Sequence, residues 1–358
     1  MQRQKFNLRL KILLILLLLS IIAWLVYILK PNKDILQMAD PVFDSHPQYF
    51  SQLNGLPVAS TAEQVPNIIG VMVDNHPDAW PQSCLGAFGS IVYEAPAEGV
   101  TTRFLQVMSA NSDLSKVGPV RSARPYFLDW LAEYGDAVYM HCGGSPRALQ
   151  LIKDRKVFDL NEFYFGEYYW RDTNKVAPHN LFTNREKWNL ILSRYSSSSD
   201  TKPWLGWHFA KDIESSLDGN PVKEIAIKYY PGYIVSWRFQ KDYAPVLYER
   251  LVNGDYQKSI CATNENNASA SVITAQNILI QFVQMETVDE VGRKEIETLG
   301  TGEAYILHNG LMIRGKWEKR AIDERTRFYN KEDKEITLLP GTTWVEVVPV
   351  GTSIEITN

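Results

Sequence analysis

A long apolar run near the N-terminus is the first feature of the hydrophobic pattern. Residues 12–29 are apolar except for Ser20. As a helix rising about 1.5 Å per residue, this run would nearly span the ~30 Å hydrocarbon core of a bilayer. Four basic residues and no acidic one precede it: Arg3, Lys5, Arg9 and Lys11. Because basic flanks stay in the cytoplasm, the pattern predicts a cytoplasmic tail (1–11), a transmembrane anchor (12–29) and an extracytoplasmic remainder.

A cleaved signal peptide and a buried helix are the alternatives for this run. A signal peptide usually has a shorter apolar region followed by a small-x-small cleavage site. The segment Ala23-Trp24-Leu25-Val26 offers no such site, and no cysteine near residue 30 could carry a lipid. We therefore expect an uncleaved single-pass anchor in the cell membrane, followed by a linker over residues 30–65.

Between residues 66 and 218, short apolar runs alternate with helix signals. The runs at 68–73, 90–94, 102–108 and 137–141 predict strands. One helix is expected from Pro125 to Gly135, and another from Pro146 to about Arg155 with Ser145 as its N-cap, because proline suits the first turn and serine the cap. The alternation predicts an α/β domain with a mixed sheet and helices.

After residue 219 the pattern changes to repeated strand signals. The segments that predict strands are 225–230, 234–239, 247–251, 272–285, 304–306, 311–316, 326–329 and 344–350. Asn253-Gly254, Asn309-Gly310 and Pro340-Gly341 are turn signals between them. We therefore expect a mostly antiparallel β domain over residues 219–358.

Composition and charge narrow the classes of protein that fit. The chain is 45% hydrophobic with ten Trp, which favours folded domains over disorder. The formal net charge is −4 although the tail is basic, so a nucleic-acid partner is not expected and any anion site must be local. The three cysteines, Cys84, Cys142 and Cys261, form no zinc or redox motif. Either one pair is oxidised and one thiol remains, or all three are small buried apolar side chains.

Two loops precede helices in the same way, at residues 118–125 and 141–146. Helix N-termini favour anions, and the pair Gly143-Gly144 allows a ligand to approach the backbone closely. Guanidinium groups from the first loop and from the preceding strand would add charge-assisted bonds to a phosphate. The predicted ligand-binding residues are Arg103, Arg121, Arg124, Gly143, Gly144 and Ser145. Alternatively, the arginines form structural pairs with Glu94, Glu98 or Asp129, and Ser145 only caps its helix.

Asp74, Glu98 and His141 are the candidates for catalysis. Asp74 and His141 end two predicted strands, and ligands of open α/β sheets bind at such ends. Asp74 with Glu98 could hold Mg²⁺ beside a substrate phosphate, and Mg²⁺ is the one cofactor that the pattern suggests. Zinc is less expected, because His76, His141 and His179 follow no known ligand spacing. Alternatively, one carboxylate or His141 is a general base.

Several motifs resemble the YerB-like putative lipoprotein family, a bacterial domain of unknown function. The motifs are residues 71–75, 91–94, 102–104, 118–124 and 141–146, and then 302–304, 309–310, 315–317 and 341–344. The string Gly118-Pro119-Val120-Arg121-Ser122-Ala123-Arg124 is the most specific of them. The resemblance implies an envelope protein with two domains and no settled activity. This chain lacks a lipid-modified cysteine near the anchor, so its anchor is expected to be transmembrane.

A weaker similarity of layout links the chain to the LytR-CpsA-Psr phosphotransferases. That family also has a short cytoplasmic tail, one transmembrane helix and an exported α/β domain, with basic residues that grip a pyrophosphate. The order Asp74, Arg103, Arg121, Arg124 is similar, although the family's Ser-Asp-Thr and Pro-Arg-Asp-Thr strings are absent. The sequence thus predicts an envelope protein that binds an anionic cell-wall-related ligand, such as a glycan or a polyprenyl phosphate. The alternatives are a phosphotransferase or hydrolase acting on a polyprenyl-linked glycan, and a non-catalytic scaffold with an envelope protein partner.

Overall fold

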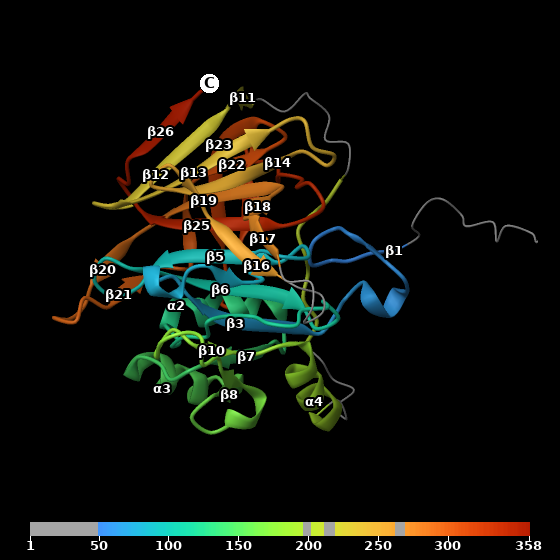
Figure 1. Ribbon diagram of the computed structural model, residues 1–358. Helices are drawn as coiled ribbons and strands as arrows, with labels where there is room; N and C mark the ends of the chain where they lie inside the picture. The colour runs from blue at the N-terminus through green and yellow to red at the C-terminus, as the bar shows by residue number, and fades with distance from the viewer. Residues whose placement is uncertain (1–48, 196–201, 211–218, 262–268) are drawn as a thin grey trace, which may run out of the picture. The chain divides into compact units, whose positions relative to one another are not determined.

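One mixed sheet of 11 strands carries strands from both halves of the sequence (Figure 1). The computed structural model describes residues 49–195, 202–210, 219–261 and 269–358. The expected tail, the anchor and most of the linker therefore lie outside the described residues. None of the helices in those described ranges is long and apolar enough to cross a membrane.

The strands of this sheet follow an order that differs from their order in the sequence. In space the order is β11 (Asn220–Pro221), β23 (Leu311–Lys319), β22 (Gly300–His308), β19 (Asn277–Val283), β25 (Thr343–Pro349), β5 (Ile91–Pro96), β6 (Thr102–Ser109), β3 (Ile68–Asp74), β7 (Val138–His141) and β8 (Phe158–Asn161), with β24 (Arg327–Tyr329) beside β23. The parallel pair β5 and β25 joins the two halves. On one side of this pair β3 lies antiparallel to β6 and parallel to β7, which makes the sheet mixed.

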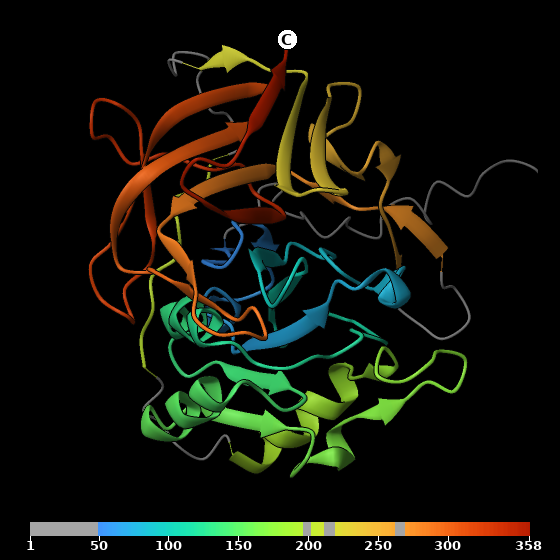
Figure 2. The same cartoon turned by 90° about the vertical axis from the view of Figure 1, so that its left-hand side faces the viewer.

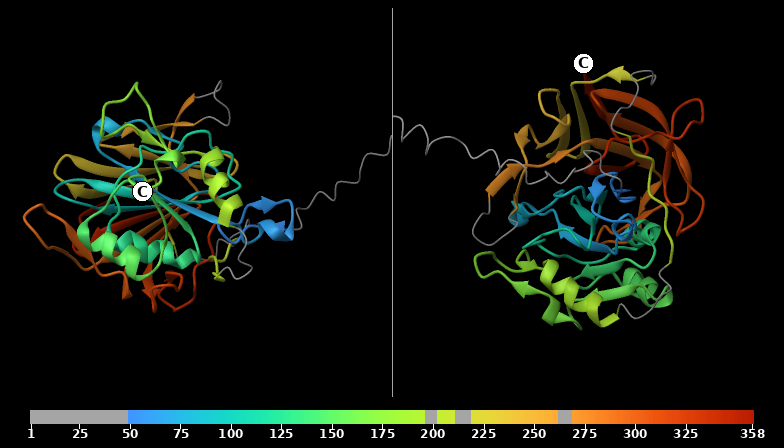
Figure 3. Two further views of the ribbon diagram at one scale, coloured as in Figure 1. Left: turned by 90° about the horizontal axis from the view of Figure 1, so that it is seen from below. Right: turned by 90° about the vertical axis from the view of Figure 1, so that its right-hand side faces the viewer.

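Few helices accompany the sheet, and they follow the strands of the N-terminal half. They are α2 (Pro125–Leu131), α3 (Pro146–Asp154) and α4 (Arg185–Tyr195). Viewed from below, the green and yellow-green helices lie across the strands (Figure 3, left). Ser145 caps α3 by accepting a hydrogen bond from the Ala148 N–H, as its sequence predicts.

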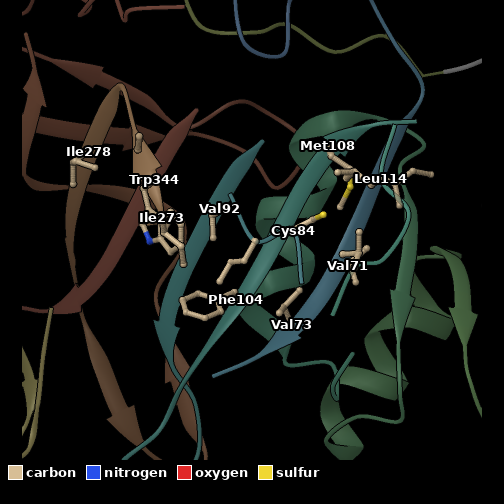
Figure 4. Packing of buried hydrophobic residues seen from close by; sticks show 14 of the residues in the cluster. Val71, Val73, Cys84, Val92, Phe104, Met108, Leu114, Ile273, Ile278 and Trp344 are labelled. Atoms are coloured by element: carbon tan, nitrogen blue, oxygen red, sulfur yellow. The ribbon is translucent and has the colours of Figure 1, made fainter. Parts of the chain in front are cut away.

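The central strands are covered on both faces, which explains their continuous apolar runs. Met72 of β3 belongs to a core cluster with Phe127 and Trp130 of α2. Its neighbours Val71 and Val73 point to the other face and join a second cluster with Phe104 and Trp344 (Figure 4). Because successive side chains of a strand alternate between faces, one apolar run supplies two cores.

A second sheet packs against the face of the mixed sheet that carries Val71 and Val73. It contains β12 (Glu224–Tyr230), β13 (Tyr233–Gln240), β14 (Leu247–Val252), β15 (Asp255–Tyr256), β18 (Thr274–Ala275) and β26 (Ile354–Thr357). All its pairings are antiparallel. The expectation of a mostly antiparallel region after residue 219 is confirmed, although that region also shares the mixed sheet.

A small third sheet and a disulfide connect distant segments. The sheet contains β4 (Gln82–Ser83), β16 (Lys258–Cys261) and β17 (Ser269–Val272), with β16 parallel to β4. Directly beside this contact, Cys84 and Cys261 form a disulfide, while Cys142 is a free thiol. The prediction of three unpaired, buried cysteines is therefore wrong. The alternative prediction, one oxidised pair and one remaining thiol, is confirmed.

Three hairpins complete the fold. They pair β1 (Tyr49–Phe50) with β2 (Pro57–Val58), β9 (Trp170–Arg171) with β10 (Leu181–Phe182), and β20 (Met285–Thr287) with β21 (Lys294–Ile296). The β20–β21 hairpin lies at the left of Figure 1, the side that faces the viewer in Figure 2, whereas β1 lies at the right. The Gly99 N–H donates to the Gly292 carbonyl between β20 and β21, so this hairpin packs against the loop that joins β5 to β6.

Candidate functional site

Asp74, the last residue of β3, is the centre of a buried polar cluster. Its Oδ2 lies 3.0 Å from Arg121 Nε and 2.6 Å from His179 Nδ1, and its Oδ1 accepts a hydrogen bond from the His76 N–H. The side chain is only 5% exposed. Both carboxylate oxygens are thus bonded to protein groups, and a role for Asp74 as a catalytic group or as a Mg²⁺ ligand stays a prediction.

Arg103 and Arg124 share a different carboxylate, that of Glu98. Arg103 Nη2 lies 2.9 Å from Glu98 Oε1, and Arg124 Nε lies 2.8 Å from Glu98 Oε2. Partial burial raises the pKa of this carboxyl, but the two guanidinium groups outweigh that effect and lower the pKa to about 2. The two arginines also donate to the backbone carbonyls of Ser122 and Ala123. These contacts correspond to the alternative in which the arginines form structural pairs with Glu98.

The two loops that the sequence singled out lie against each other. The Ala123 N–H donates to the Gly143 carbonyl, the Cys142 N–H to the Arg121 carbonyl, and the Ser145 N–H to the Ala123 carbonyl. Gly143 has φ +62°, and a Cβ there would lie 3.0 Å from the Phe163 ring, which explains a glycine at this position. The backbone groups bonded across this contact are therefore occupied within the protein.

His141 ends β7 at the start of the second loop and is fully buried. Its Nδ1 lies 2.7 Å from the Gly143 carbonyl oxygen, and its Nε2 lies 2.5 Å from Asp159 Oδ1. Because a carbonyl only accepts, Nδ1 is a donor. Neighbouring Cys142 is not an activated thiol, since partial burial and the nearby Glu162 raise its pKa to about 11.

A second buried cluster, around Arg250 of β14, was not predicted from the sequence. Arg250 bonds the carboxylates of Glu94 and of Glu346, the latter at 2.7 Å, and its guanidinium lies 4.7 Å from the centre of the Trp344 ring. All three charged side chains are fully buried. Burial and the nearby Glu94 raise the pKa of Glu346 to about 7. The alternation of side chains along β14 could have predicted this burial, because Arg250 lies on the same buried face as Tyr248 and Val252.

A pocket of about 330 Å³ opens between these two clusters, where β3 and β6 meet the β12–β13 turn. Its walls combine two aromatic rings with amides, hydroxyl groups and an imidazole. The lining residues are Asn75, His76, Pro77, Trp80, Val100, Thr101, Thr102, Pro231, Gly232, Tyr233 and Asn253. Sequence reasoning named Asn75 and His76 but missed Trp80 and Tyr233, because nothing local indicates that residues 80 and 233 meet.

Hydrogen bonds fix the pocket walls in place. Trp80 Nε1 donates to Asn75 Oδ1 at 2.9 Å, and the Asn75 amide donates to Thr102 Oγ1 at 2.6 Å. The Tyr233 hydroxyl donates to Glu94 Oε1 at 2.7 Å, which connects the wall to the Arg250 cluster. A ligand would thus meet a rigid, pre-formed surface, as small-molecule sites usually provide.

A second pocket and an aromatic stretch are further candidate sites. A larger pocket of about 720 Å³ contains Trp204, Trp207 and Arg325. In the aromatic stretch at 163–170, Phe163 and Tyr164 are exposed, while Tyr168 and Tyr169 are buried in the core. Neither the lining of that pocket nor the stretch at 163–170 includes Asp74, Arg121 or His179.

Comparisons with known proteins cover most of the chain. Residues 53–196 match the family described as "Protein of unknown function (DUF3048) N-terminal domain", and residues 225–345 match its C-terminal domain. The chain is 30% identical over 327 residues to "Putative lipoprotein YerB" of Bacillus subtilis, covering 87% of this chain and 90% of that protein. The crystal structure of YerB from Bacillus subtilis superposes with a TM-score of 0.70 at 26% identity, covering 86% of this chain and all of that one.

Both family matches contribute to the smaller pocket. Its lining residues between 75 and 102 lie in the N-terminal match, and those between 231 and 253 lie in the C-terminal match. The larger pocket is lined in part by residues 203–208, which lie between the two matches. The smaller pocket is therefore the better candidate for a site built from the matched segments alone.

Proposed function

The chain belongs to the DUF3048 family of proteins of unknown function, and on that premise we propose that it is an extracytoplasmic envelope protein that binds a sugar unit of a cell-wall-related glycan. The resemblance to YerB-like proteins that the sequence motifs indicated is confirmed by the two family matches and the YerB relative. The family supplies no activity, so the ligand is argued from the pocket.

Three observations support the location outside the cytoplasm and at the membrane. The relative from Bacillus subtilis is named "Putative lipoprotein YerB". The apolar run at 12–29 follows a basic tail, which favours export of the rest. The disulfide between Cys84 and Cys261 suits an oxidising compartment, since such bonds are rare in the cytosol.

The single observation that carries the ligand class is the mixed lining of the smaller pocket. A sugar ring has apolar C–H faces and a rim of hydroxyl groups, so it needs aromatic walls beside polar groups. Trp80 and Tyr233 supply the rings, and the Thr101 hydroxyl and the Asn253 amide supply the polar groups. No arginine or lysine lines this pocket, so a phosphate on the glycan would have to bind next to it.

The contacts of the three catalytic candidates favour binding over catalysis. Asp74 is held by Arg121 and His179, and Glu98 by two arginines. His141 is buried and bonded at both ring nitrogens. A general acid or base must reach the substrate within hydrogen-bond distance, and none of these groups lines the pocket.

Calorimetric titration of the full chain in detergent, with cell-wall glycan fragments that carry or lack phosphate, tests this proposal. We expect both kinds of fragment to bind and the change Trp80→Leu to weaken binding by up to about tenfold, the value of one aromatic contact. Val100→Trp should block the pocket, because Val100 lines it and is largely exposed.

Val176→Trp is the matched control, since Val176 is also largely exposed but lies outside the pocket. Equal binding by Val100→Trp and by the unchanged chain would contradict the proposal. Turnover of a phosphate-bearing fragment would show that the protein is an enzyme and would overturn the proposal of a binding function alone.

A further inference from the structure

Two histidines and an aspartate meet at the rim of this pocket. His76 and Asp78 flank the turn that follows β3, and His179 precedes β10. One ligand atom from each of the three lies within 4.8 Å of the others, and the two imidazole rings stack with centres 4.7 Å apart. We propose that His76, Asp78 and His179 bind a divalent transition-metal ion of the zinc class.

Asp74 provides an independent reason to expect a ligand here. A histidine that binds a metal almost always donates its other ring nitrogen to a carboxylate, which fixes the ring and its tautomer. His179 Nδ1 lies 2.6 Å from Asp74 Oδ2, and Asp74 is itself held by Arg121. Since the carboxylate only accepts, Nδ1 carries the proton and the neutral ring keeps a lone pair on Nε2.

The remaining two ligands can close on an ion without moving the core. Zinc bonds of about 2.0–2.2 Å place neighbouring tetrahedral ligands roughly 3.3 Å apart, so separations of up to 4.8 Å must shrink by up to about 1.5 Å. The His76 and Asp78 side chains are 45% and 72% exposed, whereas the His179 side chain is 12% exposed. The buried histidine thus forms the fixed part of the site and the exposed pair the adjustable part.

The charge balance suits a divalent cation. Arg121 compensates Asp74, and the Asp78 carboxylate, which lies 3.5 Å from His76 Nδ1, contributes a negative charge beside the two imidazole ligands. Lys175 lies nearby, but its Nζ donates to the Ala79 carbonyl at 3.0 Å and so holds the turn in place. Three protein ligands leave a fourth position open for water or a ligand.

The site would also supply the positive charge that the pocket lining lacks. His76 belongs both to the metal cluster and to the pocket wall, so a bound ion could reach an anionic group on a glycan in the pocket. This last step rests on the proposed function, whereas the metal site itself does not.

Metal titration of the untagged full chain, first freed of metal with a chelator, tests the site. Calorimetry should show one Zn²⁺ per chain, and Co²⁺ should give the visible absorption of a four-coordinate site. His76→Ala combined with Asp78→Asn should weaken Zn²⁺ binding at least tenfold, and both residues are exposed enough for the fold to persist. Asp74→Asn should weaken it about 10- to 100-fold, as expected for an outer-shell partner.

His208→Ala is the control, because His208 is exposed and lies outside the cluster. Undiminished zinc binding by the double variant, or an equal loss in His208→Ala, would overturn the proposal. Zinc is titrated without glycan, and glycan binding is repeated in chelator, so the failure of the metal site and the failure of the glycan site are distinguishable.

Discussion

At the residue scale, the buried guanidinium of Arg250 determines how the two sheets pack. It comes from the second sheet and pairs with Glu94 of β5 and Glu346 of β25, which are strands of the mixed sheet. Two carboxylates and one guanidinium are costly to bury unless every group is bonded. Hydrogen bonds from Tyr229 and Trp237 to Glu346 complete the cluster.

Replacing Arg250 should therefore destabilise the fold strongly. We expect Arg250→Met to lower the free energy of unfolding by about 3–5 kcal/mol, because it leaves two carboxylates buried without their partner. Urea unfolding of the full chain measures this change. Arg320→Met, which removes a largely exposed ion pair, should change the stability far less, because solvent screens such a pair, and equal effects would contradict this account of the cluster.

Glu346 makes the stability of the chain depend on pH in a predictable direction. Its pKa is raised from 4.5 to about 7, so between these values the folded chain holds a proton that the unfolded chain has lost. Stability should then fall as the pH rises from about 4.5 to 7. Urea unfolding at pH 5 and pH 7.5 should show this loss, and Glu346→Gln should reduce it. If Glu346→Gln lost as much stability between pH 5 and pH 7.5 as the unchanged chain, another group would be responsible for the pH dependence.

The arginines show what local sequence could and could not provide. The predicted ligand-binding role of Arg103, Arg121 and Arg124 stays a prediction. Glu98 is among the partners of the structural alternative, and it holds Arg103 and Arg124. The pairing of Arg121 with Asp74 was not predicted, because a carboxylate at the end of a strand could equally bind a ligand. The pocket depends on Tyr233, whose approach to Asn75 is a contact between residues 158 positions apart.

At the scale of elements, the N-terminal cap of α3 allows a test of whether Ser145 has a structural role or a ligand-binding role. Ser145 accepts a hydrogen bond from the Ala148 N–H at 3.3 Å. Ser145→Ala should lower the free energy of unfolding by about 1 kcal/mol, the usual value of an N-cap. Glycan binding should not change, since Ser145 does not line the pocket. A large loss of binding with unchanged stability would instead support the ligand role predicted from the sequence.

Individual elements were more predictable than their pairing. The segments expected at 225–230, 234–239 and 247–251 agree with β12, β13 and β14, and the Asn309-Gly310 turn joins β22 to β23. The expected strand at 272–285 instead divides into the end of β17, then β18, β19 and the start of β20. This segment contains no glycine or proline that would mark such breaks. The parallel pairing of β5 with β25 joins residues about 250 positions apart, beyond any local signal.

At the scale of the whole molecule, the shared sheet bears on the domain organisation. The division expected near residue 219 stays a prediction, and strands from both sides of it lie in one sheet. The disulfide adds a covalent link across the same division, from Cys84 to Cys261. Segments before and after residue 219 therefore contribute to one core.

The state of the three cysteines tests the proposed compartment. In a chain isolated from the envelope, alkylation after unfolding without reductant should label Cys142 alone, and reduction should expose Cys84 and Cys261 as well. Mass spectrometry of the labelled peptides distinguishes the three sites. Complete labelling of all three without reductant would indicate a reducing compartment and contradict the proposed location.

A crystal structure of the full chain with a cell-wall glycan fragment tests the central claim most directly. The account predicts a sugar ring between Trp80 and Tyr233 in the 330 Å³ pocket, with its hydroxyl groups toward the Thr101 hydroxyl and the Asn253 amide. A glycan bound instead beside Trp204 and Trp207 in the 720 Å³ pocket, or on the exposed rings of Phe163 and Tyr164, would contradict it.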